Sequence, residues 1–135
     1  MKVQSIAPVF VEFMPSVLEP GLLYISTEYR VTKHLCASGC GEPIVLPLHP
    51  GQWRFTYDGE HVSLAPSVGN ASLPCRAHYW IRDGQIVWAA PLSRQDARRG
   101  RARDRDAIEQ VLEPHQHEQV ERGGWWSRLR QLCRR

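Results

Sequence analysis

The chain has 135 residues, of which 10 are Gly and 10 are Pro, and 42% are hydrophobic. This length suits one domain with a modest core, and the many turn-forming residues favour a β-rich fold. No apolar stretch approaches a membrane span, and residues 3–14 are too interrupted by Ser, Pro and Glu to form a signal peptide. These features exclude a membrane protein and a secreted disulfide framework, so we expect a cytoplasmic protein with reduced thiols.

The formal net charge of +3 is unevenly distributed along the sequence. Residues 1–92 carry a net charge of −1, whereas residues 93–135 contain 11 Arg and carry +4. This change in composition at Ser93 predicts a boundary between a β domain at 1–92 and a basic, partly helical or flexible extension at 93–135.

Short apolar runs separated by turn residues predict about eight strands and no helix in residues 1–92. The strands are expected at 9–14, 22–26, 30–35, 44–48, 53–57, 61–64, 78–82 and 85–88. Asp58-Gly59 and Asp83-Gly84 each separate two of these runs and predict two-residue hairpins. Pro47 predicts that its strand lies at a sheet edge, because Pro has no N–H to donate. The predicted fold class is mainly β, with a small antiparallel-sheet domain at 1–92.

The extension after Ser93 contains two helical patterns. Residues 104–112 predict a short helix that ends before Pro114. Residues 125–132 form a basic amphipathic run that we expect to dock on the domain or on a partner. Nucleic-acid binding through the Arg-rich tail is a weaker alternative, because Trp and Arg together are also common at protein interfaces.

Two short motifs contain residues that bind metals. Cys36 and Cys40 form a C-x3-C pair followed by Gly41, and Cys75 and His78 form a C-x2-H pair after a Pro. Thiolate and imidazole are the ligands that Zn²⁺ prefers in proteins, so these four residues predict a Cys₃His zinc site. A closed four-ligand site leaves no open coordination position on the metal for substrate. The zinc is therefore expected to stabilise the fold as the zinc-knuckle core of the domain at 1–92.

Other interpretations of these residues remain open. His34 could replace His78 as the fourth ligand. His34 and Cys36 with Cys75 and His78 also have the ligand set of a Rieske iron–sulfur centre, but the order of the first pair is reversed and Cys40 would have no role. Without a metal, the cysteines would be small buried thiols and the histidine a satisfied core residue.

Several motifs together resemble a known bacterial family, the one catalogued as domain of unknown function 6527. They are Phe10 to Pro15, His34-Leu35-Cys36-x3-Cys40-Gly41, Val62-Ser63-Leu64-x-Pro66-Ser67-Val68-Gly69-Asn70 and Cys75-x2-His78-Tyr79-Trp80-Ile81. The resemblance covers residues 8–90; position 38 is often Cys in that family, whereas this chain has Ser38.

The resemblance implies a role and a set of partners. It implies genes placed beside E1-like, E2-like and ubiquitin-like genes in bacterial conjugation operons, some of which are linked to defence against phage. The implied activity is that of a peptidase that processes the ubiquitin-like protein or removes it from its conjugates. The ubiquitin-like protein is then the expected partner, together with the E1-like and E2-like proteins.

Ser67 is the most plausible nucleophile in the sequence. It lies in a predicted loop at 65–70, where Asn70 or nearby amides could stabilise an oxyanion. A serine needs a base, and His34 is the imidazole that the Cys₃His site does not use. If His34 were a zinc ligand, His78 would be free to act as the base, and the sequence does not separate the two assignments.

The competing interpretation is that Pro66-Ser67-x-Gly69-Asn70 is a plain turn. The protein would then be a non-catalytic zinc-binding adaptor of the conjugation system. Other catalytic classes are disfavoured because the sequence has no G-x-S-x-G elbow, no phosphate-binding glycine loop and no complete metallopeptidase motif. The leading hypothesis is therefore a serine-type peptidase, a deubiquitinase-like hydrolase with a structural zinc.

Overall fold

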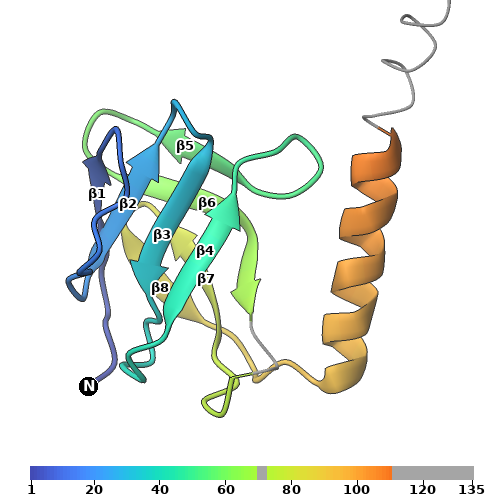
Figure 1. The fold of residues 1–135 in the computed structure, drawn as a ribbon. Coiled ribbons are helices and arrows are strands. Elements are labelled where there is room, and N and C mark those ends of the chain that lie inside the picture. The colour runs from blue at the N-terminus through green and yellow to red at the C-terminus, as the bar shows by residue number, and fades with distance from the viewer. Residues whose placement is uncertain (70–72, 111–135) are drawn as a thin grey trace, which may run out of the picture.

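A computed structural model describes residues 1–69 and 73–110 of the chain (Figure 1). In this part of the chain, eight strands precede a helix at residues 94–110, so the predicted mainly β class is confirmed. The strands are β1 (Ala7–Phe10), β2 (Leu22–Ser26), β3 (Val31–Leu35), β4 (Pro43–Pro47), β5 (Arg54–Tyr57), β6 (Val62–Gly69), β7 (His78–Arg82) and β8 (Gln85–Trp88).

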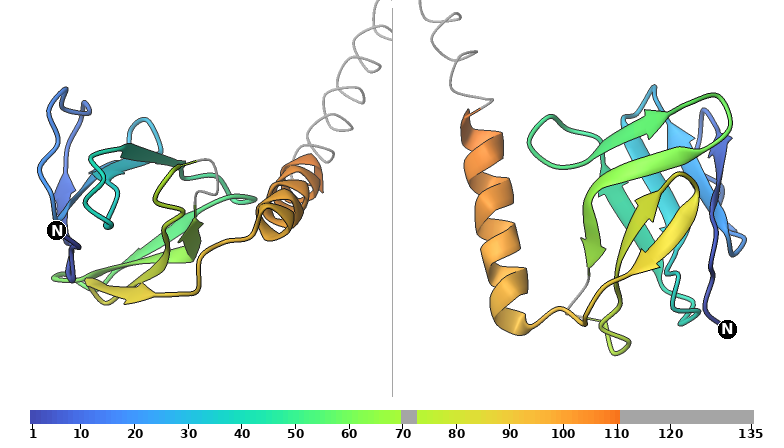
Figure 2. Two further views of the ribbon diagram at one scale, coloured as in Figure 1. Left: turned by 90° about the horizontal axis from the view of Figure 1, so that it is seen from below. Right: turned by 180° about the vertical axis from the view of Figure 1, so that it is seen from behind.

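The strands form two four-stranded sheets that pack face to face (Figures 1 and 2). The orders are β1-β2-β3-β4 and β5-β6-β7-β8, so each sheet follows the chain. All neighbours pair antiparallel, as predicted, except that β1 runs parallel to β2. β4 lies at a sheet edge, which is the position that Pro47 predicts.

The core lies between the sheets because side chains alternate along each strand. In β7, Tyr79 and Ile81 are buried while their neighbours are less buried or exposed, and β4 alternates in the same way. Leu23 and Ile25 of β2 pack into the same core from the opposite sheet, and both are 0% exposed. Full burial of one such side chain contributes roughly 1.5–3 kcal/mol to stability.

The two predicted hairpins differ in the structure. Arg82 pairs with Gln85, so Asp83-Gly84 is a two-residue turn, and both turn residues have positive φ (47° and 73°), as a type I′ turn requires. At the other turn Tyr57 pairs with Val62, which leaves a loop of residues 58–61, so the two-residue prediction is wrong there.

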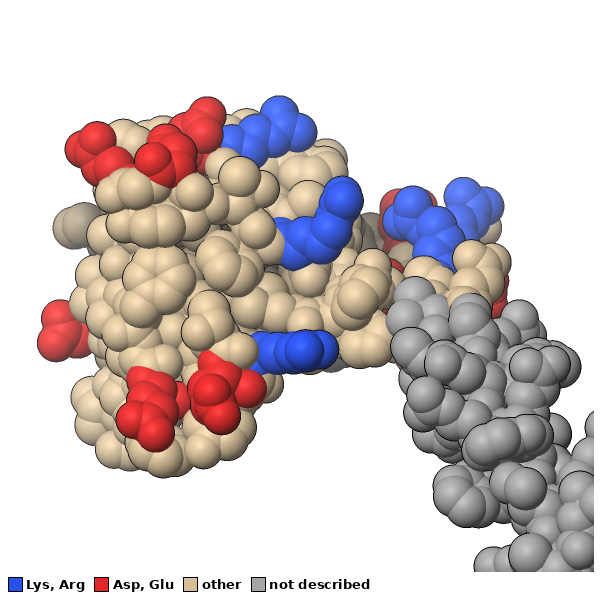
Figure 3. All heavy atoms as spheres, turned by 90° about the horizontal axis from the view of Figure 1, so that it is seen from above, with Lys and Arg blue, Asp and Glu red and all other residues tan. Residues whose placement is uncertain are grey.

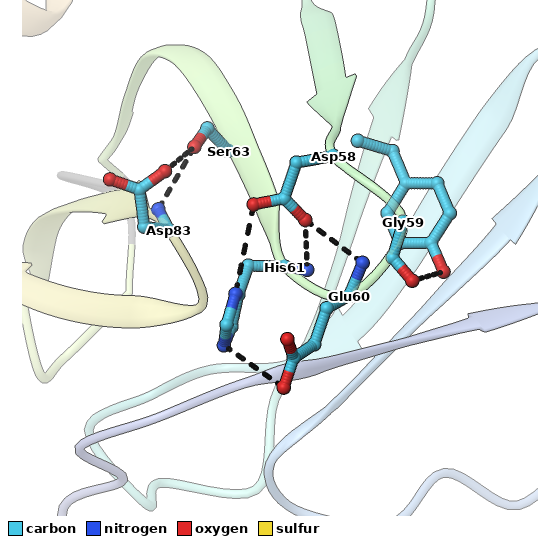
Figure 4. Close-up of polar contacts among 7 residues, drawn as sticks. Asp58, Gly59, Glu60, His61, Ser63 and Asp83 are labelled. Carbon is cyan, nitrogen blue, oxygen red and sulfur yellow. Dashed lines mark hydrogen bonds and ion pairs between the residues drawn. The ribbon is translucent and has the colours of Figure 1, made fainter.

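Side-chain hydrogen bonds explain the longer loop (Figure 4). The Asp58 carboxylate accepts the backbone N–H groups of Glu60 and His61 at 2.9 and 2.6 Å, and these bonds hold the pKa of Asp58 below its ordinary value. The Ser63 hydroxyl accepts the N–H of Asp83 at 2.9 Å, which ties β6 to the β7–β8 turn.

β6 is longer than the sequence predicts. Residues 65–70 are expected to form a loop, but the strand continues to Gly69 through a cis Ala65-Pro66 peptide bond. Leu64 pairs with Ile81 and Val68 with Tyr79, so residues 65–67 of β6 lie opposite Trp80 alone. A bulge of this kind accommodates Pro66, because the strand need not supply a ladder N–H there.

The helix begins earlier than the predicted 104–112. The Ser93 hydroxyl accepts the N–H of Asp96 at 3.0 Å and donates to its carboxylate, which caps the helix N-terminus. The end of the predicted helix and the amphipathic run at 125–132 lie outside the described residues. In the described part of the chain, no helix is both long and apolar enough to cross a membrane.

The helix packs against the loop that precedes β5. A Cβ atom at Gly51 would lie 2.9 Å from the backbone of Ala107 and Ile108, and Ala97 is 7% exposed. Figure 3 shows that, on the β domain seen from above, Lys and Arg side chains lie toward the helix and Asp and Glu lie mainly away from it, whereas both signs of charge occur around the helix.

We expect Gly51→Ala to weaken the contact between the helix and the β domain. The added methyl group meets backbone atoms that cannot rotate away, and overpacking of this kind costs about 1–3 kcal/mol. Hydrogen exchange should show reduced protection in residues 94–110. Gly100→Ala is the matched control, because nothing lies within 4 Å of its added Cβ and alanine should stabilise the helix by about 0.5–1 kcal/mol. Unchanged protection in Gly51→Ala would contradict the packing described here.

Candidate active site and metal centre

Ser67 and His78 face each other on neighbouring strands. The Oγ atom of Ser67 lies 2.9 Å from Nε2 of His78, and both side chains are partly buried. Ser67 belongs to the bulged segment of β6, and His78 is the first residue of β7, where it pairs with Gly69. β-Bulges are frequent next to active sites because they redirect a side chain.

A backbone carbonyl orients the His78 ring. Nδ1 of His78 lies 2.8 Å from the carbonyl oxygen of Ala90. A carbonyl only accepts, so the proton is assigned to Nδ1, and Nε2 is left to accept the Ser67 hydroxyl. This tautomer is the one that a general base for a serine nucleophile requires.

The imidazole of His78 is packed closely by its surroundings. A Cβ atom at Gly69 would lie 3.3 Å from Cδ2 of His78 and 3.0 Å from Cδ1 of Leu92. The Arg76 guanidinium donates to the carbonyl oxygen of Leu92 at 3.0 Å. Glycine at position 69 therefore allows the His78 ring and Leu92 to occupy the space that a side chain would fill.

His34, the base expected from the sequence, lies elsewhere. It is 0% exposed on β3, and its Nε2 atom is 2.9 Å from the Tyr79 hydroxyl, which also accepts the N–H of Ala37 at 3.3 Å. Burial lowers the pKa of His34 to about 4. The structure thus brings Ser67 next to His78 and leaves His34 in the core. Asn70, the expected oxyanion donor, lies outside the described residues.

Three of the four predicted zinc ligands come together. The sulfur atoms of Cys36, Cys40 and Cys75 all lie within 4.8 Å of one another, and those of Cys36 and Cys75 are 3.9 Å apart. Zn–S bonds of about 2.3 Å in a tetrahedral site place two sulfurs about 3.8 Å apart, so this cluster could hold a zinc ion. All three are free thiols.

Neither candidate histidine belongs to this cluster among the described residues. Ser38 does lie beside it: its Oγ is 3.2 Å from Sγ of Cys36 and accepts the N–H of Cys40 at 3.3 Å. Hydrogen bonding to Ser38 lowers the pKa of Cys40, whereas burial raises the pKa of Cys36. The cluster therefore offers three thiols and one neighbouring hydroxyl.

The sequence did not predict that the Ala90 carbonyl orients His78, or that the absence of a side chain at Gly69 makes room for the His78 ring. Ala90 acts through its backbone carbonyl, which leaves no signature in its residue type. The importance of Gly69 follows from its register opposite His78, and that register depends on the bulge in β6. The C-x3-C and C-x2-H spacing did indicate that the cysteines gather, but it could not separate the two histidines.

Comparison with known proteins places most of the β domain in a described family. Residues 10–89 match the model of the BubE family, described as a bacterial ubiquitination-like system serine protease. The matched region contains Ser67, His78 and the three clustered cysteines. No curated protein and no solved structure matches the chain.

We expect the purified protein to bind about one zinc ion through its cysteine cluster. Cys36→Ser should abolish stoichiometric zinc, measured by elemental analysis, and should lower the thermal stability, because a lost structural zinc removes folding free energy. His61→Ser is the control, since this exposed histidine of the β5–β6 loop lies outside the cluster and its replacement should leave the zinc content unchanged. Ser38→Cys should tighten zinc binding in a chelator competition, because a fourth thiolate replaces a hydroxyl. Full zinc retention in Cys36→Ser would contradict this assignment.

Proposed function

The chain belongs to the BubE family, and on this basis we propose that it is a serine peptidase that processes a bacterial ubiquitin-like protein or removes it from conjugates. In this proposal Ser67 is the nucleophile and His78 is the general base. The 2.9 Å contact between Ser67 Oγ and His78 Nε2 is the observation that supports it most directly.

The geometry suits acyl transfer. As the Ser67 oxygen attacks the scissile carbonyl, its proton passes to Nε2 of His78, and the imidazolium then donates that proton to the leaving amine. Water attacks the resulting ester with His78 again acting as base, which releases the product and restores the serine. Ala90 keeps the ring in the required tautomer through both steps. A positioned base of this kind typically contributes 10²–10⁴-fold to the rate.

We assign the base to His78 instead of His34 for two reasons. The Ser67 hydroxyl is within hydrogen-bond distance of His78, and both groups are accessible enough to meet a substrate. His34 is 0% exposed and is bonded to Tyr79 of the opposite sheet. Its role in this proposal is to join the two sheets.

The cysteine cluster supports the site from one side. Cys36 follows β3 in the first sheet, and Cys75 stands three residues before His78. A bound zinc would cross-link these segments and supply structural stability, with no part in the reaction. The cross-link would fix the segment between Cys75 and the start of β7 at His78. It would thereby help to hold the His78 backbone against β6.

The expected biological setting follows from the resemblance to family 6527. It predicts E1-like and E2-like partners encoded nearby and a ubiquitin-like protein as substrate. We expect this activity in the cytoplasm, where three unpaired thiols near a metal site stay reduced.

Ser67→Ala and His78→Gln should both abolish cleavage of a ubiquitin-like protein fused at its C-terminal end to a reporter. Ser67→Ala should reduce kcat/KM by at least about 10³-fold, and His78→Gln by about 10²–10⁴-fold. Gel analysis of fusion cleavage measures both rates, and thermal unfolding checks that each variant is folded.

His34→Gln is the matched control for His78→Gln. It should lower the melting temperature because it disturbs a buried hydrogen bond, while the folded fraction keeps kcat/KM within about tenfold of wild type. The opposite pattern, with activity lost in folded His34→Gln and kept in His78→Gln, would transfer the role of base to His34. Cleavage by Ser67→Ala at the wild-type rate would leave the zinc-binding adaptor as the remaining interpretation.

Gly69→Ala should reduce activity without removing a functional group. The added methyl group lies 3.3 Å from the imidazole and 3.0 Å from Leu92, so the ring must shift from Ser67. We expect kcat to fall by about tenfold, because a ring shift of a few tenths of an ångström lengthens the contact with Ser67, with thermal stability lowered by about 1–3 kcal/mol. Changed NMR signals of the His78 ring would confirm the shift, and wild-type kcat would contradict it.

A further inference from the structure

A groove lies on the outer face of the second sheet, and Trp80, which lines it, stands two residues after His78 on β7. It has a volume of about 450 Å³ and is formed by residues of β5, β6 and β7. The side chains that matter most for its chemistry are Arg54, Thr56, Ser63, Trp80 and Arg82.

The groove and the proposed catalytic pair share one face of the second sheet because of the alternation along β7. Tyr79 and Ile81 point into the core, so His78, Trp80 and Arg82 share the opposite face. The Cα atoms of residues two apart on a strand are separated by about 7 Å. Trp80 therefore lies about 7 Å along β7 from His78, on the same face. Trp80 is also the residue opposite the bulge that contains Ser67. The groove therefore begins at Trp80, two residues along β7 from His78, and extends along the sheet toward Arg82.

The charge of the groove is positive. Arg54 and Arg82 are both exposed, and no Asp or Glu lines the groove. The guanidinium of Arg82 lies over the Trp80 ring, 4.7 Å from its centroid, which orients it across the aromatic surface. The nearest acid in sequence, Asp83, hydrogen-bonds Ser63 at the turn and leaves one negative charge at that end of the groove against the two guanidinium groups (Figure 4). This local positive charge stands out, because residues 1–92 carry a net charge of −1.

We propose that this groove binds an acidic segment of the polypeptide that the protein cleaves, next to the scissile bond. The proposal rests on the proposed peptidase function and adds a substrate preference to it. Arg54 and Arg82 would each pair with a carboxylate, which guanidinium groups bind with two parallel hydrogen bonds. The Trp80 ring would pack against the aliphatic part of the bound segment. Because the groove residues lie along neighbouring strands, the groove favours a peptide in an extended conformation.

Binding can be tested without catalysis in the full chain with Ser67→Ala. The probes are two fluorescein-labelled peptides, one with Glu alternating with Gly and one with Lys in place of Glu, measured by anisotropy at a salt concentration near 150 mM. The Glu peptide should bind at least about tenfold more tightly than the Lys peptide, and Arg54→Glu with Arg82→Glu should remove that preference.

Arg30→Glu with Arg99→Glu is the matched control, because it changes the net charge equally and neither residue lines the groove. It should leave the affinity within about twofold. If the control variant loses binding while the groove variant keeps it, the acidic peptide binds elsewhere and the proposal is overturned. A single-stranded oligonucleotide that displaces the Glu peptide at lower concentration than unlabelled peptide would also overturn it.

A cleavage experiment separates this proposal from the proposed function. Two ubiquitin-like fusions that differ only in Glu or Lys residues flanking the scissile bond are compared with the active protein. A preference for the Glu fusion that reverses in Arg54→Glu with Arg82→Glu supports the groove as a specificity site. Equal cleavage of both fusions keeps the peptidase function and overturns the groove. If neither fusion is cut, the peptidase function fails, and the substrate preference fails with it even where the peptide binds.

Discussion

The register shift between β6 and β7 is the constraint on which the site depends. Regular pairing from Leu64 and Ile81 would place Ser67 directly opposite His78. The bulge adds two residues to β6 and places Gly69 there instead, so that Ser67 is released from cross-strand pairing and reaches Nε2 with its side chain. Because two residues are added, the alternation of faces is preserved and Val68 still enters the core. One local irregularity thus positions the hydroxyl and clears space for the imidazole.

The Ala90 carbonyl orients the imidazole after β8, and the proposed zinc at the cysteine cluster would restrain the chain before it. Before it, Cys75 belongs to a cluster with two cysteines that follow β3 of the other sheet. After it, the chain turns through β8 and returns to place the Ala90 carbonyl on Nδ1. Both restraints depend on packing of the two sheets, so stability of the sandwich and geometry of the site are coupled. A substitution that separates the sheets is therefore expected to affect the histidine even when it lies far from Ser67.

Much of this fold could be predicted from local patterns, and the failures have physical causes. Strand β2 and the Asp83-Gly84 turn follow from an apolar run and from two residues that tolerate positive φ. The continuation of β6 could not be predicted, because Pro66 normally ends a strand and only the pairing with β7 shows that a bulge accommodates it. The early helix start was hidden by an Arg-rich segment with little apolar periodicity, in which the Ser93 cap was the main local signal.

The candidate site was predictable in its parts but not in its pairing. Cysteine spacing indicated the cluster, and Ser67 was found from its neighbours, yet the partner of the serine depends on which histidine the folded sheets bring to it. His34 occupies an inward position of β3, whereas His78 occupies an outward position of β7. Strand parity decides this difference, and a one-residue change in the predicted register would exchange the two faces.

The choice of a backbone carbonyl as orienting group has a chemical consequence. A carboxylate in the position of Ala90 would stabilise the imidazolium with a full negative charge, whereas a carbonyl supplies only a dipole. Such a pair should depend more strongly on substrate binding to align the scissile bond, since less of the barrier is lowered by the base itself. In the proposed mechanism such alignment would come from substrate contacts outside the pair, and the Trp80–Arg82 face beside His78 is a surface that could supply them.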